Sequence, residues 1–218
     1  MTGRRHFLTG AAAASVTFGL IGQSAAAADT PTDADIGFCT DMTAHHVQAL
    51  AMCQRVLGRD TGDPVQAAAA EVLQNQAIEV GMMRAWLTDW AASTAEPDTV
   101  MAWMHDGTGI PTADMPGYAT PEQLRELSLA DGLQQGRMWL EVMRAHHVGG
   151  VSMAEAALGL ASSDKVLRLA EIQAMVQAFE ISQYDLLLSG EYAAVEQLYC
   201  DLETDAAATI DAGVEHDH

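Results

Sequence analysis

The chain contains few basic residues. Its 218 residues include 10 lysines and arginines against 30 aspartates and glutamates, so the formal net charge is −20. A surface of this charge repels phosphate backbones and anionic headgroups, which argues against nucleic acid and anionic membranes as partners. The same acidity is compatible with collecting cations, and equally with keeping an exported protein soluble.

Catalytic motifs are also scarce. The sequence has neither a glycine-rich phosphate loop nor a Gly-x-Ser-x-Gly nucleophile elbow, and nothing in it favours Ser-His-Asp catalysis. The Glu-x-x-His pattern of di-iron bundles is missing from the expected core helices, because Met82 follows Glu79 and Gln183 follows Glu180 at that spacing. We therefore predict no enzyme activity and no organic cofactor, and a ferritin-like oxidase is the least favoured function.

Aromatic residues make up only 6% of the chain, whereas hydrophobic residues make up 49%. This composition predicts one compact domain with an aliphatic core. Strand patterns are nearly absent, but helix caps are frequent: Thr32 or Asp33, Asp63-Pro64, and the capping box at Thr120. We expect helices over residues 33–57, 63–90, 120–158 and 164–190, a shorter helix over 192–209, and a disordered tail over 211–218.

Residues 1–28 have the pattern of an export signal. Arg4-Arg5 resembles the twin-arginine motif, an apolar stretch covers residues 11–21, and Ala26-Ala27-Ala28 forms a small-residue cleavage site. The apolar stretch is short for a membrane span, and no cysteine at the cleavage site provides a lipid anchor. We predict export across the cytoplasmic membrane by the twin-arginine route to the periplasm, cell wall or medium, without a stable membrane anchor.

Three cysteines leave at least one unpaired in a monomer. Cys39 and Cys53 fall on one expected helix about 21 Å apart at ~1.5 Å per residue, too far for a disulfide. Cys39 with Cys200 is the expected pair, which would join the first helix to the C-terminal segment. Cys53, seven residues after His46 on the same helix face, is then either a thiolate ligand or a buried free thiol, the commoner role.

One pattern occurs twice, 101 residues apart. Of the 46 positions from 42 to 87, 15 are identical to their partners. The two copies predict two helical hairpins, over about 33–91 and 120–190, joined by a linker over about 92–119. Neither hairpin can bury its apolar face alone, so we expect them to pack as an all-α four-helix bundle within one domain of residues 29–210, with residues 191–210 as a C-terminal segment.

The repeated residues have the chemistry of soft metal ligands. Thioethers and imidazoles are the side chains that Cu(I) prefers, and silver follows by softness. Each copy keeps a His-His pair between two methionines, and small residues, Ala49 and Gly150, accompany the histidines with room for a partner helix or an ion. The linker adds Met104 and His105. The candidate ligands are Met42, His45, His46, Met52, Met143, His146, His147, Met153, Met104 and His105.

The copies also share a Gln-x-x-Glu pattern on the second helix of each hairpin, at Gln76 and Glu79 and at Gln177 and Glu180. A glutamate on an apolar face needs a partner, and a histidine of the neighbouring helix is the natural one. Such a carboxylate fixes the imidazole tautomer and leaves the other ring nitrogen for a metal. We expect these four residues to contact the metal ligands and not the metal itself. The alternative is that His–Glu pairs only join the helices, in a metal-free structural or interaction bundle.

These motifs resemble the domain-of-unknown-function 305 family, which includes CopM-like extracytoplasmic copper-binding proteins. The resemblance rests on Phe38-x3-Met42-x2-His45-His46-x2-Ala49-x2-Met52, on Gln76-x2-Glu79-Val80-x2-Met83, and on the second copy from Trp139 to Ala154 with Gln177-x2-Glu180. It implies a ferritin-like bundle and copper or silver binding through His and Met, without catalysis. The linker is poorer in methionine than the family pattern, so fewer sites are expected.

The function predicted from the sequence is capture, buffering or delivery of Cu(I), or of Cu(II) at His-rich positions, outside the cytoplasm. The expected partners are metal ions and a copper-delivery or export protein. The sequence leaves the stoichiometry, the oxidation state of the metal and the oligomeric state open.

Overall fold

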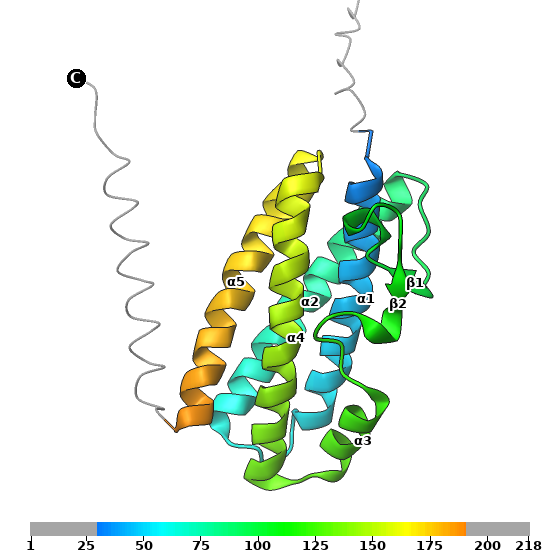
Figure 1. Cartoon of the computed structure of the whole chain (residues 1–218). Helices are drawn as coiled ribbons and strands as arrows, with labels where there is room; N and C mark the ends of the chain where they lie inside the picture. Colours follow the sequence, from blue (N-terminus) through cyan, green and yellow to red (C-terminus); the bar gives the residue numbers. More distant parts are fainter. Residues whose placement is uncertain (1–29, 191–218) are drawn as a thin grey trace, which may run out of the picture.

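The computed structural model describes residues 30–190, which form five α-helices and a short ordered linker (Figure 1). The expected signal peptide, the helix over 192–209, the C-terminal tail and Cys200 lie outside the described residues. The helices are α1 (Asp33–Val56), α2 (Asp63–Asp89), α3 (Pro121–Leu129), α4 (Gly132–Leu160) and α5 (Asp164–Ser189). Within residues 30–190, none of them combines the length and the apolar character that a membrane crossing requires.

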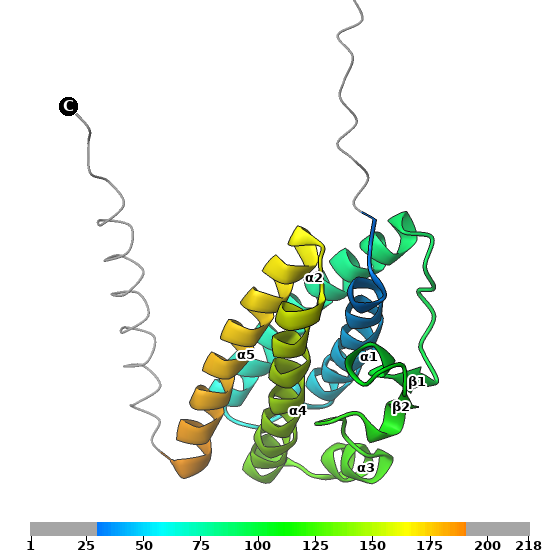
Figure 2. The ribbon, with the colours of Figure 1, turned by 45° about the horizontal axis from the view of Figure 1, so that its top comes forward.

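Four long helices form a bundle of two hairpins, as the repeat predicts. The hairpins are α1 with α2 and α4 with α5, and the two pack together mainly through α1 and α4. These two helices run in opposite directions, so the hairpins face each other about an approximate twofold axis across the bundle (Figures 1 and 2). Residues related by the 101-residue repeat therefore lie in matching environments on the two sides of this axis.

Local sequence signals place the helix ends. Thr32 caps α1 in a capping box with Asp35, and the carboxylate of Asp35 also accepts the backbone N–H groups of Ser162 and Ser163, so it ties α1 to the α4–α5 turn. The capping box at Thr120 opens α3 as predicted. Gly190 ends α5 in the left-handed conformation, at φ 84°.

The single helix expected over 120–158 is wrong, because the structure contains two helices there. Ala130 and Asp131 are extended, and Gly132 has a positive φ of 54°, which breaks the helix between α3 and α4. The break lets α3 fold across the end of the bundle and bury Leu127. The buried Gln135 amide stabilises this corner, since it donates to the Leu127 carbonyl at 2.9 Å.

The linker between the hairpins is ordered and packs along α1 and α4. It contains an antiparallel pair of two-residue strands, β1 (Thr99–Val100) and β2 (Ile110–Pro111), and two 3-10 turns, η1 (Ala102–Met104) and η2 (Thr112–Asp114). Its second half reaches the bundle at Ala119, whose backbone N–H and C=O both bond to the side-chain amide of Gln48 on α1, at 2.6 and 2.9 Å.

Two glycines allow the linker backbone to approach α4. A Cβ atom at Gly149 would overlap the Pro116 carbonyl, and a Cβ atom at Gly117 would lie 2.9 Å from the Cα of His146. Both residues must therefore be glycine for this contact to form. As a result, residues 115–119 cover α4 beside the first histidine of its pair.

The core has two apolar clusters, one toward each end of the bundle. The first contains Phe38, Leu87 and Val166, and the second contains Val72, Trp139 and Tyr184. At the first end, the Nζ of Lys165 lies 5.5 and 4.5 Å from the ring centroids of Trp86 and Trp90, which joins α5 to α2 by cation–π contacts. A layer of buried polar residues also crosses the bundle, and it contains the repeated histidines.

Candidate metal-binding centre

The first histidines of the two pairs meet near the approximate twofold axis. The rings of His45 on α1 and His146 on α4 are stacked, with centroids 3.6 Å apart and planes inclined by 26°. The Nε2 atom of His146 also lies 3.0 Å from the backbone oxygen of His45. Both side chains are fully buried. The repeat thus creates one shared feature at the centre of the bundle.

The second histidine of each pair faces the glutamate of its own hairpin, as the sequence predicted. His46 Nε2 lies 2.6 Å from a carboxylate oxygen of Glu79, and His147 Nε2 lies 2.7 Å from one of Glu180. Both imidazoles are fully buried, and the carboxylates are mostly buried. A carboxylate at Nε2 favours the tautomer with its proton there, which leaves Nδ1 with a lone pair.

Burial keeps the central histidines neutral. The pKa of His45 and the pKa of His146 are both well below the ordinary value of 6.5, mainly because desolvation disfavours the charged ring, and because the neighbouring histidines add to this effect. The backbone at Pro116 opposes the shift at His45, and the backbone of His45 opposes it at His146. A neutral imidazole is the form that binds a metal ion.

Several ring nitrogens in this layer make no hydrogen bond within the protein. They include the Nδ1 atoms of His46, His146 and His147. A buried polar atom usually has a partner, so such atoms require an explanation. A bound cation is one explanation that suits a neutral imidazole nitrogen.

Methionines lie on both sides of the histidine layer. Met52 and Met143 pack in the second core cluster. The first cluster holds more thioethers, and its five fully or almost fully buried methionines are named here the methionine cluster: Met42, Met83, Met101, Met115 and Met153. The antiparallel crossing of α1 and α4 therefore pairs the first methionine of one copy with the second methionine of the other, an arrangement that the repeat alone does not specify.

The two copies are not equivalent at their His–Glu pairs. Beside His46, the amide of Gln173 on α5 donates to Glu79 at 2.9 Å. The residue at the matching position of the first copy is Val72, so Glu180 has no corresponding amide. At that second pair the ring of Tyr184 lies 5.5 Å from the ring of His147. The first pair is therefore held by an additional hydrogen bond and the second by an aromatic contact.

The two described cysteines, Cys39 and Cys53, are buried, and neither forms a disulfide within residues 30–190. Desolvation raises the pKa of Cys39 to about 12 and the pKa of Cys53 to about 12, and a nearby carboxylate, Asp35 or Glu180 respectively, adds to each shift. Without a metal ion, a thiol with such a pKa stays protonated at neutral pH. The predicted bond between Cys39 and Cys200 stays a prediction, because Cys200 lies outside the described residues.

The remaining predicted site residues are Met104, His105, Gln76 and Gln177. Met104 is partly buried and packs against the first core cluster, whereas His105 is exposed on the linker, apart from the other histidines. Gln76 and Gln177 are buried in the polar layer, and the side chain of Gln177 fills the space beside Gly150. The room expected next to the histidines of the second copy is therefore occupied by this amide.

Several residues around the histidines are not among the site residues predicted from the sequence. Met83, Met101 and Met115 join the methionine cluster, and Gln173 joins the first His–Glu pair. Two signals could have found them: Gln173 lies one helical turn before Gln177, and Met83 lies one turn after Glu79. No local signal reveals which linker methionines are buried.

The donor set fits a soft cation better than a hard one. Within residues 30–190, no group of three or more His, Cys, Asp and Glu side chains is arranged to hold a metal ion. A zinc or di-iron centre needs such a group. Thioethers and neutral imidazoles are present instead, and these are ligands of Cu(I) and silver.

Comparison with protein families gives one match, over residues 35–188, to the model described as "Domain of unknown function (DUF305)". A DUF305 protein from Streptomyces coelicolor has a similar structure, with 36% identity, 72% of this chain and 93% of that chain covered, and a TM-score of 0.66. A DUF305 fragment from Deinococcus radiodurans has 28% identity, coverage of 73% and 97%, and a TM-score of 0.62. No curated protein matches the chain.

The copper-bound protein CopM shares the fold at lower identity. Its Cu(II)-bound form is 21% identical to this chain, covers 72% of it over 97% of its own length, and gives a TM-score of 0.56. Structures of CopM in Cu(I)-bound and Ag-bound forms match similarly, each with a TM-score of 0.54. At this identity the likeness establishes the four-helix bundle alone.

Proposed function

The chain belongs to the DUF305 family, and from that premise we propose that it is an extracytoplasmic copper-binding protein. It captures Cu(I), and Cu(II) at histidine-rich positions, and buffers or delivers the ion in copper homeostasis or resistance. The function is binding without a catalytic step, and silver binds through the same thioethers. The copper- and silver-bound forms of CopM support this proposal by fold.

The observation that carries the proposal is the gathering of soft donors inside the bundle. Two helices separated by 101 residues bring four imidazoles into one buried layer and place methionines on both sides of it. Methionine is a common core residue, so its burial alone does not indicate a metal. The combination with imidazoles whose Nδ1 atoms have no protein partner does favour one, and the lowered pKa of His146 keeps that ring in the neutral form that binds metals.

Each part of the layer has a distinct role in this proposal. The ligand pool is His45, His46, His146 and His147 with Met42, Met52, Met143 and Met153. Glu79 and Glu180 orient their histidines from the side away from the ion. A carboxylate close to Nε2 favours the tautomer protonated there, which leaves the Nδ1 lone pair available for the metal.

The test is a Cu(I) competition titration of the chain from Asp29 to His218 against a chromophoric chelator, under anaerobic reducing conditions. The double variant Met42→Leu and Met153→Leu removes two thioethers with little change in side-chain volume. We expect it to bind Cu(I) more weakly than the wild type, whereas Met175→Leu, at a side chain 65% exposed on α5, binds equally well. Equal binding by all three proteins would contradict the assignment of the ligands.

The second candidate is a metal-free structural or interaction bundle. It is favoured by the short, buried His–Glu contacts, which join the helices of each hairpin without any ion. This function predicts that His46→Gln lowers the melting temperature by the same amount with and without Cu(I). The copper-binding proposal predicts that Cu(I) raises the melting temperature of the wild type, by mass action, and raises that of the variant less.

The location of the protein is part of the proposal. The twin-arginine motif and the cleavage site support export, and the Streptomyces relative is described as secreted. Export of the wild-type precursor and its retention in the cytoplasm after Arg4→Lys with Arg5→Lys would support the twin-arginine route. Unchanged export of the double variant would contradict it.

A further inference from the structure

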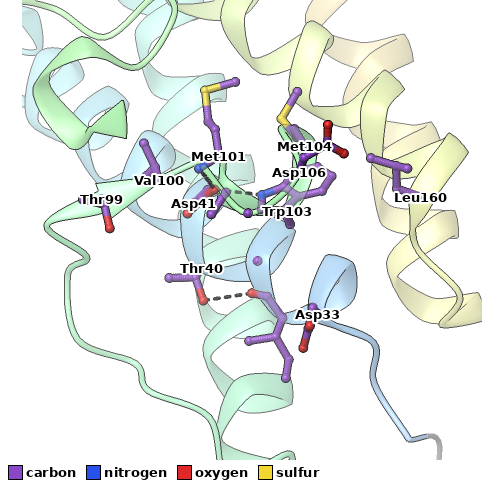
Figure 3. A pocket seen from close by; sticks show the side chains of 14 residues that line it. Asp33, Thr40, Asp41, Thr99, Val100, Met101, Trp103, Met104, Asp106 and Leu160 are labelled. Carbon is purple, nitrogen blue, oxygen red and sulfur yellow. Dashed lines mark hydrogen bonds between the residues drawn. The ribbon is translucent and has the colours of Figure 1, made fainter. Parts of the chain in front are cut away.

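A surface pocket lies between the first turns of α1 and the linker. It has a volume of about 610 Å³, and its walls include Gly37, Asp41, Met101, Trp103, Met104 and Leu160. Figure 3 shows the side chains of Met101 and Met104 extending from the linker in the same direction, with the carboxylate of Asp106 beside Met104. The lining of the pocket therefore includes two thioether side chains and a carboxylate.

Met101 belongs to this pocket and to the core at the same time. It lines the pocket, it is only 4% exposed, and it is a member of the methionine cluster together with Met42 and Met153. Met104 also lines the pocket and packs, partly buried, against the same cluster. The wall between the surface pocket and the buried thioethers is thus made of methionine side chains.

The backbone of Met101 is held in an unusual conformation. Its φ is +64°, in the left-handed region that residues other than glycine rarely adopt. The buried carboxylate of Asp41 fixes it, because one oxygen accepts the N–H of Met101 at 2.6 Å and the indole N–H of Trp103 at 2.8 Å (Figure 3). Strain of this kind persists where the surroundings enforce it, and it is common at functional sites.

Two further contacts lock the same loop to α1. The Trp103 ring lies directly against Gly37, where a Cβ atom would overlap the indole. The ring also meets Phe38 edge-on, with centroids 6.1 Å apart. Asp41 has no equivalent in the second copy, where the matching residue is Val142. Within residues 30–190, the linker therefore forms this pocket against the first copy of the repeat and not the second.

We propose that this pocket is the entry site for the soft ion, and that Met101 is the ligand that passes the ion from the surface to the methionine cluster. Met104 makes the first thioether contact, and Asp106 attracts the cation to the pocket. Asp41 is a positioning residue that holds the Met101 thioether in the wall. This route rests on the proposed function, since it assumes that a soft cation binds inside the bundle.

The experiment follows the rate of Cu(I) transfer from a coloured chelator complex to the full mature chain by stopped-flow absorbance. We expect Met101→Leu to slow uptake by about tenfold or more, because leucine fills the same wall without a donor atom. Met104→Leu slows uptake less, because the Met101 thioether between the pocket and the methionine cluster remains. The matched control, Met175→Leu, changes an exposed methionine away from the pocket and keeps the wild-type rate.

A second variant guards against a folding defect in the first. Gly37→Ala displaces the Trp103 ring and loosens the loop. It should therefore lower the barrier to passage of the ion and accelerate release of bound Cu(I) to excess chelator, whereas Met101→Leu raises that barrier. Asp41→Asn keeps an acceptor oxygen, so its rate of Cu(I) release should stay close to that of the wild type. Asp41→Ala should release Cu(I) faster, as Gly37→Ala does. Circular dichroism and melting temperature report whether each variant is folded.

The outcomes separate the route from the proposed function. If an equilibrium titration shows that the wild type takes up no Cu(I), both the proposed function and the entry route are wrong. Tight wild-type binding together with wild-type rates in Met101→Leu and unchanged release in Gly37→Ala would overturn the route alone. Slower uptake in Met101→Leu with an unchanged melting temperature would support it.

Discussion

The contact between the linker and α4 can be tested with two glycine-to-alanine substitutions. Gly149 lies inside α4, where a methyl group would overlap the backbone carbonyl of Pro116. Gly81 lies inside α2, where a methyl group would meet no atom within 4 Å. Both replacements give the same gain in helix propensity, so their difference isolates the steric effect of the linker.

The magnitudes follow from these two terms. Replacing an exposed mid-helix glycine by alanine stabilises a helix by about 0.5–1 kcal/mol, which is the whole effect expected for Gly81→Ala. At Gly149 the same gain is opposed by overpacking, which typically costs about 1–3 kcal/mol. The carbonyl is part of the backbone and cannot rotate away, so the linker must shift. The two variants should therefore differ by about 1–3 kcal/mol, with Gly149→Ala less stable than the wild type.

Thermal unfolding followed by circular dichroism measures this difference. For a domain of this size, 1 kcal/mol corresponds to a change of about 2–4 °C in melting temperature. Hydrogen exchange provides a second readout. In the wild type the backbone N–H of Ala119 donates to the side-chain oxygen of Gln48, and Gly149→Ala should raise the exchange rate of this N–H. The reasoning fails if Gly149→Ala stabilises the protein as much as Gly81→Ala does, because the linker would then not lie against α4.

Three other outcomes are expected. Folding lowers the pKa of His45 and that of His146, so the unfolded chain binds protons at these residues more readily than the folded protein. The free energy of unfolding should therefore be constant above pH about 6.5 and should decrease below it, by up to about 2.7 kcal/mol per pH unit for the two groups. Urea midpoints that stay equal from pH 7 to pH 5 would contradict this. Asp41→Ala leaves the buried N–H of Met101 and the partly buried indole N–H of Trp103 without their acceptor. It should lower the free energy of unfolding in urea by about 1–3 kcal/mol, most of it from the Met101 N–H, whereas Asp41→Asn should lower it less. Lys165→Met removes the cation above two indole rings, and a loss of about 0.5–2 kcal/mol is expected by thermal unfolding, while an unchanged melting temperature would show that this contact contributes nothing.

Most of the helices, and the buried histidines and methionines of the repeat, could be predicted from the sequence because their signals are local or repeated. Capping residues at Thr32 and Thr120 act within one helical turn, so they specify helix starts without tertiary contacts. The break at Gly132 was missed because the hydrophobic pattern continues through it, and only the packing of Leu127 across the bundle end makes the interruption favourable. The pairing of Glu79 with a histidine of the neighbouring helix could be inferred, since a buried carboxylate requires a partner. Only the structure shows that this histidine is His46.

The sequence by itself determined that two equivalent hairpins must pack, that each brings a His-His pair and a glutamate to the interior, and that the chemistry is that of soft donors. It could do so because periodicity and burial of unpaired charge are local constraints. Only the tertiary structure decided that His45 stacks on His146, that Met42 joins Met153, and that the linker closes one side of the bundle over Asp41. Those relations depend on the antiparallel crossing of α1 and α4 and on close backbone approaches at Gly149, which no spacing along the chain encodes.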